Sequence, residues 1–300
     1  GNNIAIGYDA LANNTTASSN TAVGWQALQT NTTGINLVAI GRDALKSNST
    51  GAENIAIGSY ALYDNTTGTY NTAIGYNAVF NNHDGAHITA VGYKALENSG
   101  TSASHNTVVG AFAAWKADGN AEYNTGVGSK VLYELTTGDK NTAMGYNALY
   151  NNTTGNYNTA VGNQTLDANT TGYSLTAIGQ GALGANTTGT HNTACGINAL
   201  GSNTTAASNT AVGTDCLYGN TTGTGNTAVG RETLDANTTG AYNTAVGQQA
   251  LTAATTPNYN TAVGQAALYN TTTGETNTAV GASALASNTT GHYNTAVGYQ

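Results

Sequence analysis

Charged residues, proline and bulky core-forming side chains are all scarce in this 300-residue chain. Only 7% of its residues are charged, against roughly 25% in an average domain, and Pro257 is the single proline. Phenylalanine occurs only as Phe80 and Phe112, which excludes the broad aromatic core of a compact globule. Gly, Asn, Thr and Ala dominate, and a polar chain of this kind without further pattern would be disordered. Order must therefore come from periodicity.

Clusters of positive charge and long apolar runs are missing as well. The net charge is -8 and the seven Lys and Arg residues form no run, which argues against nucleic acid and anionic membranes as partners. No apolar stretch approaches the roughly 20 residues of a membrane helix, and we expect no signal peptide within these 300 residues. Cys195 and Cys216 fall at different positions of the repeat described next, so we expect two small buried side chains rather than a disulfide.

The whole chain is built from one repeat. A glycine closes each Asn-Thr-Ala-Val-Gly-like string from Gly7 to Gly298, at intervals of 17 residues, except for two intervals of 18 between Gly92, Gly110 and Gly128. This spacing gives 18 copies of the consensus N-T-A-V-G-x-x-A-L-x-x-N-T-T-G-x-Y, whose positions we number 1 to 17. Both ends fall within a repeat. We therefore expect residues 1–300 to be a single continuous array, cut as a window from a longer fibre.

The repeat positions differ in the side chains that they accept. Position 4 is always of a buried type and position 9 is nearly always Leu, so we expect Val161, Leu166, Val229 and Leu234 to lie inside. Position 2 is Thr or a β-branched apolar residue, which predicts an inward side chain with its hydroxyl bonded along a ladder. Charged residues fall almost entirely at the x positions and position 17, with Asp84 as an exception, so these positions are expected to face water.

The same pattern predicts an all-β chain. Positions 1 to 4 and positions 7 to 10 have the character of two short strands, and Asn-Thr-Thr-Gly has that of a turn. The two Gly and the β-branched Thr residues of each repeat would cost a helix several kcal/mol. A unit this small buries its apolar side chains only by stacking, which predicts a parallel β-solenoid, or β-roll, of 18 coils with 17 residues per coil and about 4.8 Å between coils. Like residues then stack on like, including ladders of Asn.

Position 3 is alanine in almost every repeat. If positions 2 and 4 point inward, position 3 points outward, because side chains alternate along a strand. A stripe of small side chains would then allow close approach of a second copy, and we expect a homo-oligomer, a trimer or a filament, packed through it. The alternative is that another segment of the same chain covers the stripe. The predicted packing stripe consists of Ala5, Ala22, Ala39, Ala56, Ala73, Ala90, Ala143, Ala160, Ala177, Ala194, Ala211, Ala228, Ala245, Ala262, Ala279 and Ala296.

Two strings in the repeat carry a resemblance to known families. Asn20-Thr21-Ala22-Val23-Gly24 and Asn54-Ile55-Ala56-Ile57-Gly58 resemble the head repeats of trimeric autotransporter adhesins. The longer unit, with Ala-Leu and Asn-Thr-Thr-Gly added, is similar to repeats of phage tail-fibre shafts and large secreted bacterial surface proteins. The resemblance covers all 300 residues and implies a left-handed parallel β-roll, three-fold association, and a place at the cell surface, outside the cell or in a virion tail. The coil of 17 residues is longer than that of the adhesin heads.

These patterns favour a structural role, in which the chain gives an extracellular fibre, adhesin stalk or tail fibre its reach and stiffness. A host-receptor- or glycan-binding adhesin head is the alternative, because Tyr recurs at position 6, as in Tyr76 and Tyr93, and at position 17, as in Tyr242 and Tyr259. Ice binding through ranks of Thr is a lesser alternative, since the Thr of position 2 is expected to point inward.

Residues for catalysis, cofactors or metals are not predicted, and we expect no enzyme. The segment from Gly179 to Gly184 matches the dinucleotide motif G-x-G-x-x-G but lacks its βαβ context. The five histidines show no metal-ligand spacing. Asn-Thr-Thr strings form glycosylation sequons, yet Leu135 and Ala254 replace this Asn, which indicates an inward position and leaves glycosylation open.

The two 18-residue intervals lie side by side in the sequence. Between Gly92 and Gly110 the turn is rewritten, and Trp115 stands beside the Leu position of the next copy. The structural interpretation is a local bulge in which Trp115 fills extra volume. A binding notch is the functional interpretation.

Overall fold

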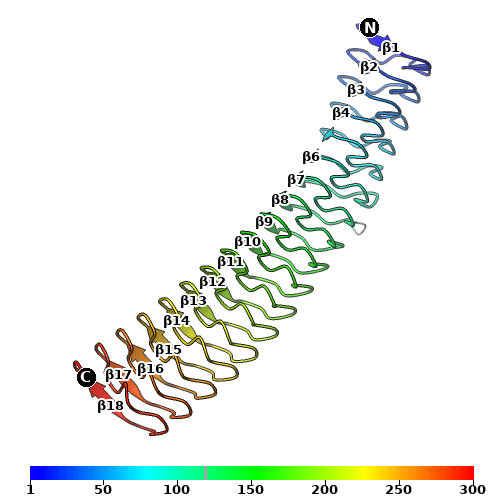
Figure 1. Cartoon of the computed structure of the whole chain (residues 1–300). Helices are drawn as coiled ribbons and strands as arrows, with labels where there is room; N and C mark the ends of the chain where they lie inside the picture. Colours follow the sequence, from blue (N-terminus) through cyan, green and yellow to red (C-terminus); the bar gives the residue numbers. More distant parts are fainter. Residues whose placement is uncertain (118–119) are drawn as a thin grey trace. The chain divides into compact units, whose positions relative to one another are not determined.

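The computed structural model describes residues 1–117 and 120–300 and divides the chain into two compact units, residues 1–155 and 156–300. Each unit is a stack of coils with one three-residue strand per coil, and the described residues contain no helix (Figure 1). The strands of the first unit are β1 (Ile4–Ile6), β2 (Thr21–Val23), β3 (Val38–Ile40), β4 (Ile55–Ile57), β5 (Thr72–Ile74), β6 (Thr89–Val91), β7 (Thr107–Val109), β8 (Thr125–Val127) and β9 (Thr142–Met144). The strands of the second unit are β10 (Thr159–Val161), β11 (Thr176–Ile178), β12 (Thr193–Cys195), β13 (Thr210–Val212), β14 (Thr227–Val229), β15 (Thr244–Val246), β16 (Thr261–Val263), β17 (Thr278–Val280) and β18 (Thr295–Val297).

Within each unit, successive strands pair in parallel, each with the strand one repeat further along. β11 and β12, for example, align Thr176 with Thr193 and Ala177 with Ala194, and β1 and β2 align Ala5 with Ala22 in the same way. Every position of the repeat therefore stacks on its equivalent in the next coil. The predicted all-β parallel solenoid with a coil of about 17 residues is confirmed.

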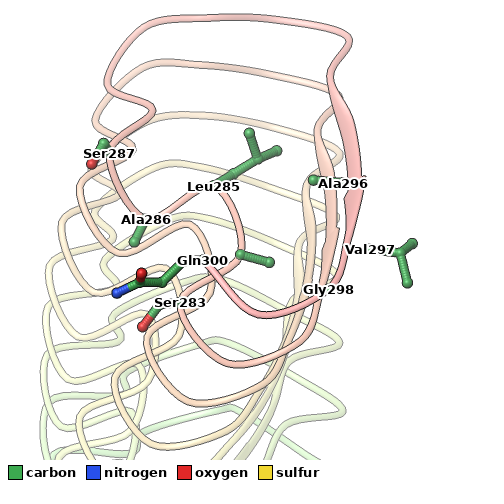
Figure 2. Close-up of a pocket in the computed structure, with 9 residues that line it drawn as sticks. Ser283, Leu285, Ala286, Ser287, Ala296, Val297, Gly298 and Gln300 are labelled. Carbon is green, nitrogen blue, oxygen red and sulfur yellow. The ribbon is translucent and has the colours of Figure 1, made fainter.

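The interior of each coil is lined by positions 1, 3, 8, 9 and 12. In the coil of β14, Ala228, Leu234 and Asn237 are fully buried, whereas Val229 is 37% exposed. Figure 2 shows the same directions in the last coil, where Leu285 and Ala296 lie within the coil and Val297 points away from it.

The predicted inward direction is therefore confirmed for position 9 and wrong for positions 2 and 4. Leu166 and Leu234 are fully buried, but Val161 and Val229 face outward. The physical reason is the narrow coil: a 17-residue turn leaves room for a methyl group on its strand, and the larger β-branched side chains take the outer side.

The predicted second strand at positions 7 to 10 is also wrong. These residues form turns, in which positions 7 and 9 adopt left-handed backbone angles, such as φ 54° at Asn198 and φ 53° at Leu200. Ala199 and Leu200 are consecutive and both fully buried, which the alternation of a strand does not allow. The left-handed residues let two neighbouring side chains point into the same interior.

Hydrogen bonds join neighbouring coils around most of their circumference. In the coil of β12, the backbone N–H groups of Leu200 and Ser202 donate to carbonyls of the next coil over 2.9 and 3.0 Å. Inside, Asn203 Nδ2 donates to Asn186 Oδ1 over 2.8 Å, and Asn220 Nδ2 donates to Asn203 Oδ1 over 3.1 Å. The expected Asn ladder is thus present at position 12.

The glycine of position 5 is required by both conformation and space. Gly213 has φ 138°, which side-chain-bearing residues rarely adopt, and a Cβ atom there would clash with the backbone carbonyl of Gly230 in the next coil. This close approach ends the strand and turns the chain.

Candidate functional surface

The alanines of position 3 form the inner wall of the strand and not an outer stripe. Fourteen of them are fully buried, and Ala5 and Ala296 belong to the first and last coils, where no further coil covers them. The prediction of an outward alanine stripe for oligomer packing is therefore wrong. The fixed identity of position 3 reflects the narrow interior. The alanines of the predicted stripe, which the structure places on the inner side of the strands, are Ala5, Ala22, Ala39, Ala56, Ala73, Ala90, Ala143, Ala160, Ala177, Ala194, Ala211, Ala228, Ala245, Ala262, Ala279 and Ala296.

The outer side of the strands is uncharged and differs between two regions. In β1–β4 it is an apolar face, whose members are Ile4, Ile6, Val23, Val38, Ile40, Ile55 and Ile57, with Thr21 as the one hydroxyl. In β10–β18 it is a Thr/Val face: position 2 is Thr in all nine strands, and position 4 is Val except at Ile178 and Cys195. Sequence reasoning missed both faces because it inverted the strand.

Aromatic residues form outward stacks along the first unit. Tyr76 and Tyr93 stack with ring centroids 5.5 Å apart, and a four-ring stack runs through Tyr70, His87, His105 and Tyr123, whose neighbouring centroids are 5.1, 5.0 and 4.8 Å apart. The rings lie nearly parallel, so they cover each other's faces and present mainly edges to solvent. Stacking of a sugar ring needs a free aromatic face, which these stacked rows offer poorly.

In the irregular coils of the first unit, large and small interior side chains stand at different positions from those of the regular repeat. The coil of β7 carries Val108 at position 3 and Ala114 at the Leu position, and the next coil carries Gly126 at position 3 and Val131 at position 8. A Cβ atom on Gly126 would lie 3.1 Å from Val131 Cγ1, so the two substitutions fit each other. Each enlarged side chain accompanies a reduced one, which keeps the interior filled.

Trp115 is half-buried on the outer side of the irregular coils, where its ring packs against Tyr133. Its ring stands 5.1 Å from Tyr133, and its Nε1 donates to Glu97 Oε2. Glu97 is largely buried, accepts a hydrogen bond from Asn77 Nδ2 over 2.6 Å, and pairs with Lys94 at 3.2 Å. These five residues, the Glu97 cluster, tie together coils that the regular repeat does not join in this way.

A shallow hollow of about 380 Å³ lies beside the Glu97 cluster, at the predicted notch. Asn81, His83, Asn98, Gly100, Thr101 and Lys116 line it. Asn81 and Asn98 are joined by a 3.0 Å hydrogen bond, and the Lys116 ammonium binds both carboxylate oxygens of Glu134 at 2.8 Å. A second hollow, of about 540 Å³, is the interior of the last coil viewed from its end (Figure 2).

The two cysteines occupy opposite sides of the coil wall and are both free. Cys195, at position 4 of β12, is exposed, which corrects the expectation that both thiols are buried. Cys216, at position 8, is buried and donates to the Ala228 carbonyl over 3.2 Å. Burial raises the pKa of the Cys216 thiol to about 12, so this group stays protonated and unreactive near neutral pH.

The G-x-G-x-x-G match and the glycosylation sequons are parts of the structural repeat. Gly179 of the G-x-G-x-x-G match ends β11, and Asn31 and Asn203 of the sequons are fully buried with their amides bonded inside the coil. Among residues 1–117 and 120–300, no group of three or more His, Cys, Asp or Glu side chains could hold a metal ion. The same residues include no helix long and apolar enough to span a membrane.

Neither a protein-family model nor a curated protein matches this chain.

Proposed function

We propose that the chain is a structural segment of an extracellular fibre or shaft, at a cell surface or in a virion tail, and that it supplies reach and stiffness. The observation that carries the proposal is the continuous bonding between coils. In the second unit, strand pairing, turn-to-turn backbone bonds and the Asn ladder repeat in coil after coil. Bending such a stack strains several hydrogen bonds in every coil at once.

Self-association is the second part of the proposal, and the apolar face of β1–β4 supports it. Ile40 and Ile55, which lie between neighbouring coils, are 39% and 38% exposed. A contiguous row of large apolar side chains in water is typical of a protein–protein interface. The resemblance of the repeat to trimeric adhesin heads favours three copies, which would meet through this face.

A matched pair of substitutions tests the association surface. The double variant Ile40→Lys/Ile55→Lys places two charges on the apolar face, whereas Ile35→Lys places one on an equally exposed isoleucine away from it. We expect light scattering to find an oligomer for the parent chain and for Ile35→Lys, and a monomer for the double variant. A monomeric parent chain would remove self-association from the proposal.

Electron microscopy of the native material tests the fibre itself. The proposal predicts thin shafts or filaments that antibodies against this chain decorate along their length. Compact particles without filaments would contradict the structural role, whatever the result of the association test.

The glycan-binding alternative receives no comparable support. Its proposed contacts were the tyrosine rows, and where these tyrosines stand in adjacent coils, such as Tyr242 and Tyr259 at 5.4 Å, the rings stack on each other.

A further inference from the structure

The Thr/Val face of the second unit is the most regular surface of the described chain. Nine consecutive strands place Thr on Thr at position 2 and a β-branched residue at position 4, with Cys195 as the one departure. Their side chains are half-buried or exposed, and each points away from the coil. The threonines at position 2 of these strands are Thr159, Thr176, Thr193, Thr210, Thr227, Thr244, Thr261, Thr278 and Thr295.

In the part of the chain that the structure describes, the hydroxyls of this face have no hydrogen-bond partner. Among the described residues no hydrogen bond involves the side chain of Thr193, Thr210 or Thr227, or of any other threonine in the row. The threonines of position 13 behave differently: Thr204 and Thr221 donate their hydroxyls to carbonyls of the next coil over 3.2 and 3.0 Å. Position 2 thus holds an array of unused hydroxyls, while position 13 uses its hydroxyls to join the coils.

The array is periodic in two directions. Neighbouring threonines are about 4.8 Å apart along the stack, and Thr and Val of one strand are about 6.7 Å apart. β-Branched side chains have few rotamers, so the methyl and hydroxyl groups keep these spacings with little loss of entropy on binding. No strand position carries a charge, and Arg231 is the only lysine or arginine between residues 156 and 300.

We propose that the Thr/Val face of β10–β18 binds ice. A crystalline lattice of water presents uncharged hydrogen-bonding sites at fixed repeats, and a surface binds it over an extended area only if its own groups repeat in both directions. The free hydroxyls bond lattice waters while the methyl groups of Thr and Val sit in the spaces between them. The apolar face of β1–β4 lacks the hydroxyl row and suits a second copy instead.

The proposal requires the outward direction of position 2. It is independent of self-association, because the two roles use different strands. Binding to ice also needs no pocket, metal or catalytic group, and the strand positions of β10–β18 that form this face carry no aromatic or charged side chain.

The test measures the partition of the fluorescently labelled full chain into a growing ice shell, together with thermal hysteresis. The parent chain is expected to enter the ice and to depress the freezing point below the melting point. Thr227→Lys and Val229→Lys, which each place a flexible charge at the middle of the face, are expected to lose most of both effects. Thr222→Lys makes the same change at an exposed threonine of position 14, off the face, and is expected to keep them.

Circular dichroism and melting curves of the three variants separate a lost surface from a lost fold. Exclusion of the parent chain from ice would overturn the proposal, as would equal losses in Thr222→Lys and the two face variants. Binding to crystalline cellulose or chitin with exclusion from ice would also overturn it, in favour of a different periodic solid.

Discussion

The coils of β11–β14 and those of β6–β8 solve the same stacking problem in different ways. In the first group, position 12 is Asn throughout, and the ladder from Asn169 to Asn237 runs without a break. In the second group the same position holds Ser99, Ala117 and Leu135, and the ladder is absent. The irregular coils instead have the Glu97 cluster and the Lys116–Glu134 ion pair on their outer surface.

The difference indicates where each region keeps its polar bonds. Regular coils join their neighbours through amides inside the wall, where the low dielectric strengthens them. At position 12 the irregular coils have apolar or short residues. Their position 1 asparagines still bond inside the coil, as Asn124 Nδ2 does to Asn106 Oδ1 over 3.2 Å, and long side chains add contacts outside. The last rung before the irregular coils is the bond from Asn65 Nδ2 to Asn48 Oδ1. The buried Asn65 Oδ1, Asn82 Oδ1 and Ser99 Oγ beyond it lack partners. Variation is therefore tolerated when another set of contacts replaces the lost one.

The largest expected effect comes from placing a charge in a regular interior. Leu200→Asp buries a carboxylate with no cation near it and should lower the free energy of unfolding by about 3 kcal/mol or more. Lys130→Asp, on the surface of an irregular coil, should change it by less than about 0.5 kcal/mol. Urea unfolding of both variants measures the difference, and similar shifts would mean that position 9 does not face the interior.

The inner ladder gives the next largest effect. Asn203→Ala removes donors and acceptors from Asn186 and Asn220 and should cost about 2 kcal/mol, the usual penalty for buried polar atoms left unpaired. Ser99→Ala removes a hydroxyl that has no partner and should cost nothing. Equal losses in chemical denaturation would show that the regular and irregular coils do not differ in their inner bonding.

The volume exchange in the irregular coils predicts an energetic coupling. Gly126→Ala crowds Val131 Cγ1 and should cost about 1 kcal/mol, and Val131→Ala should leave a cavity that costs about 2 kcal/mol. The double variant restores the alanines of the regular repeat, so it should be more stable than the sum of the two losses predicts. A double-mutant cycle in urea measures this coupling; strict additivity would contradict the proposed fit.

The smallest expected effect is a pH dependence in the second unit. Burial, with smaller contributions from Glu232 and Asp215, raises the pKa of the Asp235 carboxyl, so its ionised form opposes folding. Stability from this group is present below the ordinary carboxyl pKa and is lost as the pH rises through the raised value. Asp235→Asn should therefore melt slightly above the parent at pH 7 and equal it in acid. If the parent chain instead melts at a higher temperature than Asp235→Asn at pH 7, the ionised Asp235 carboxylate has a favourable interaction in the folded state.

The period, register and much of the interior follow from the sequence, because a strict 17-residue repeat leaves one way to stack. The buried positions 9 and 12 were predicted from Leu and from the replacement of Asn by Leu135 and Ala254. The face of the strand that points into the coil was not predicted. Alternation allows either position 3 or positions 2 and 4 to point inward, and the apolar residue at position 4 favours the second arrangement, which is wrong. The sequence does contain signals that position 3 points inward: Val108 at position 3 accompanies the smaller Ala114, and Gly126 at position 3 accompanies the larger Val131.

The candidate surfaces were misjudged for the same reason. An inverted strand places threonine inside and alanine outside, so the apolar face and the Thr/Val face could not be predicted. The left-handed turns at positions 7 to 10 were not predicted, because the Ala-Leu pair has a composition typical of a strand. Two adjacent apolar residues that recur together contradict alternation, and this observation alone predicts a turn in which both point inward.

The two cysteines provide the most direct test of the account, because they report on the two sides of the coil wall. Cys195 takes an outward position 4 and Cys216 an inward position 8. Labelling of the native chain with a water-soluble thiol reagent, followed by mass spectrometry, should modify Cys195 rapidly and Cys216 only after unfolding. Protection of Cys195 in a monomeric native chain, or rapid labelling of Cys216, would contradict the assignment of inside and outside on which both proposals depend.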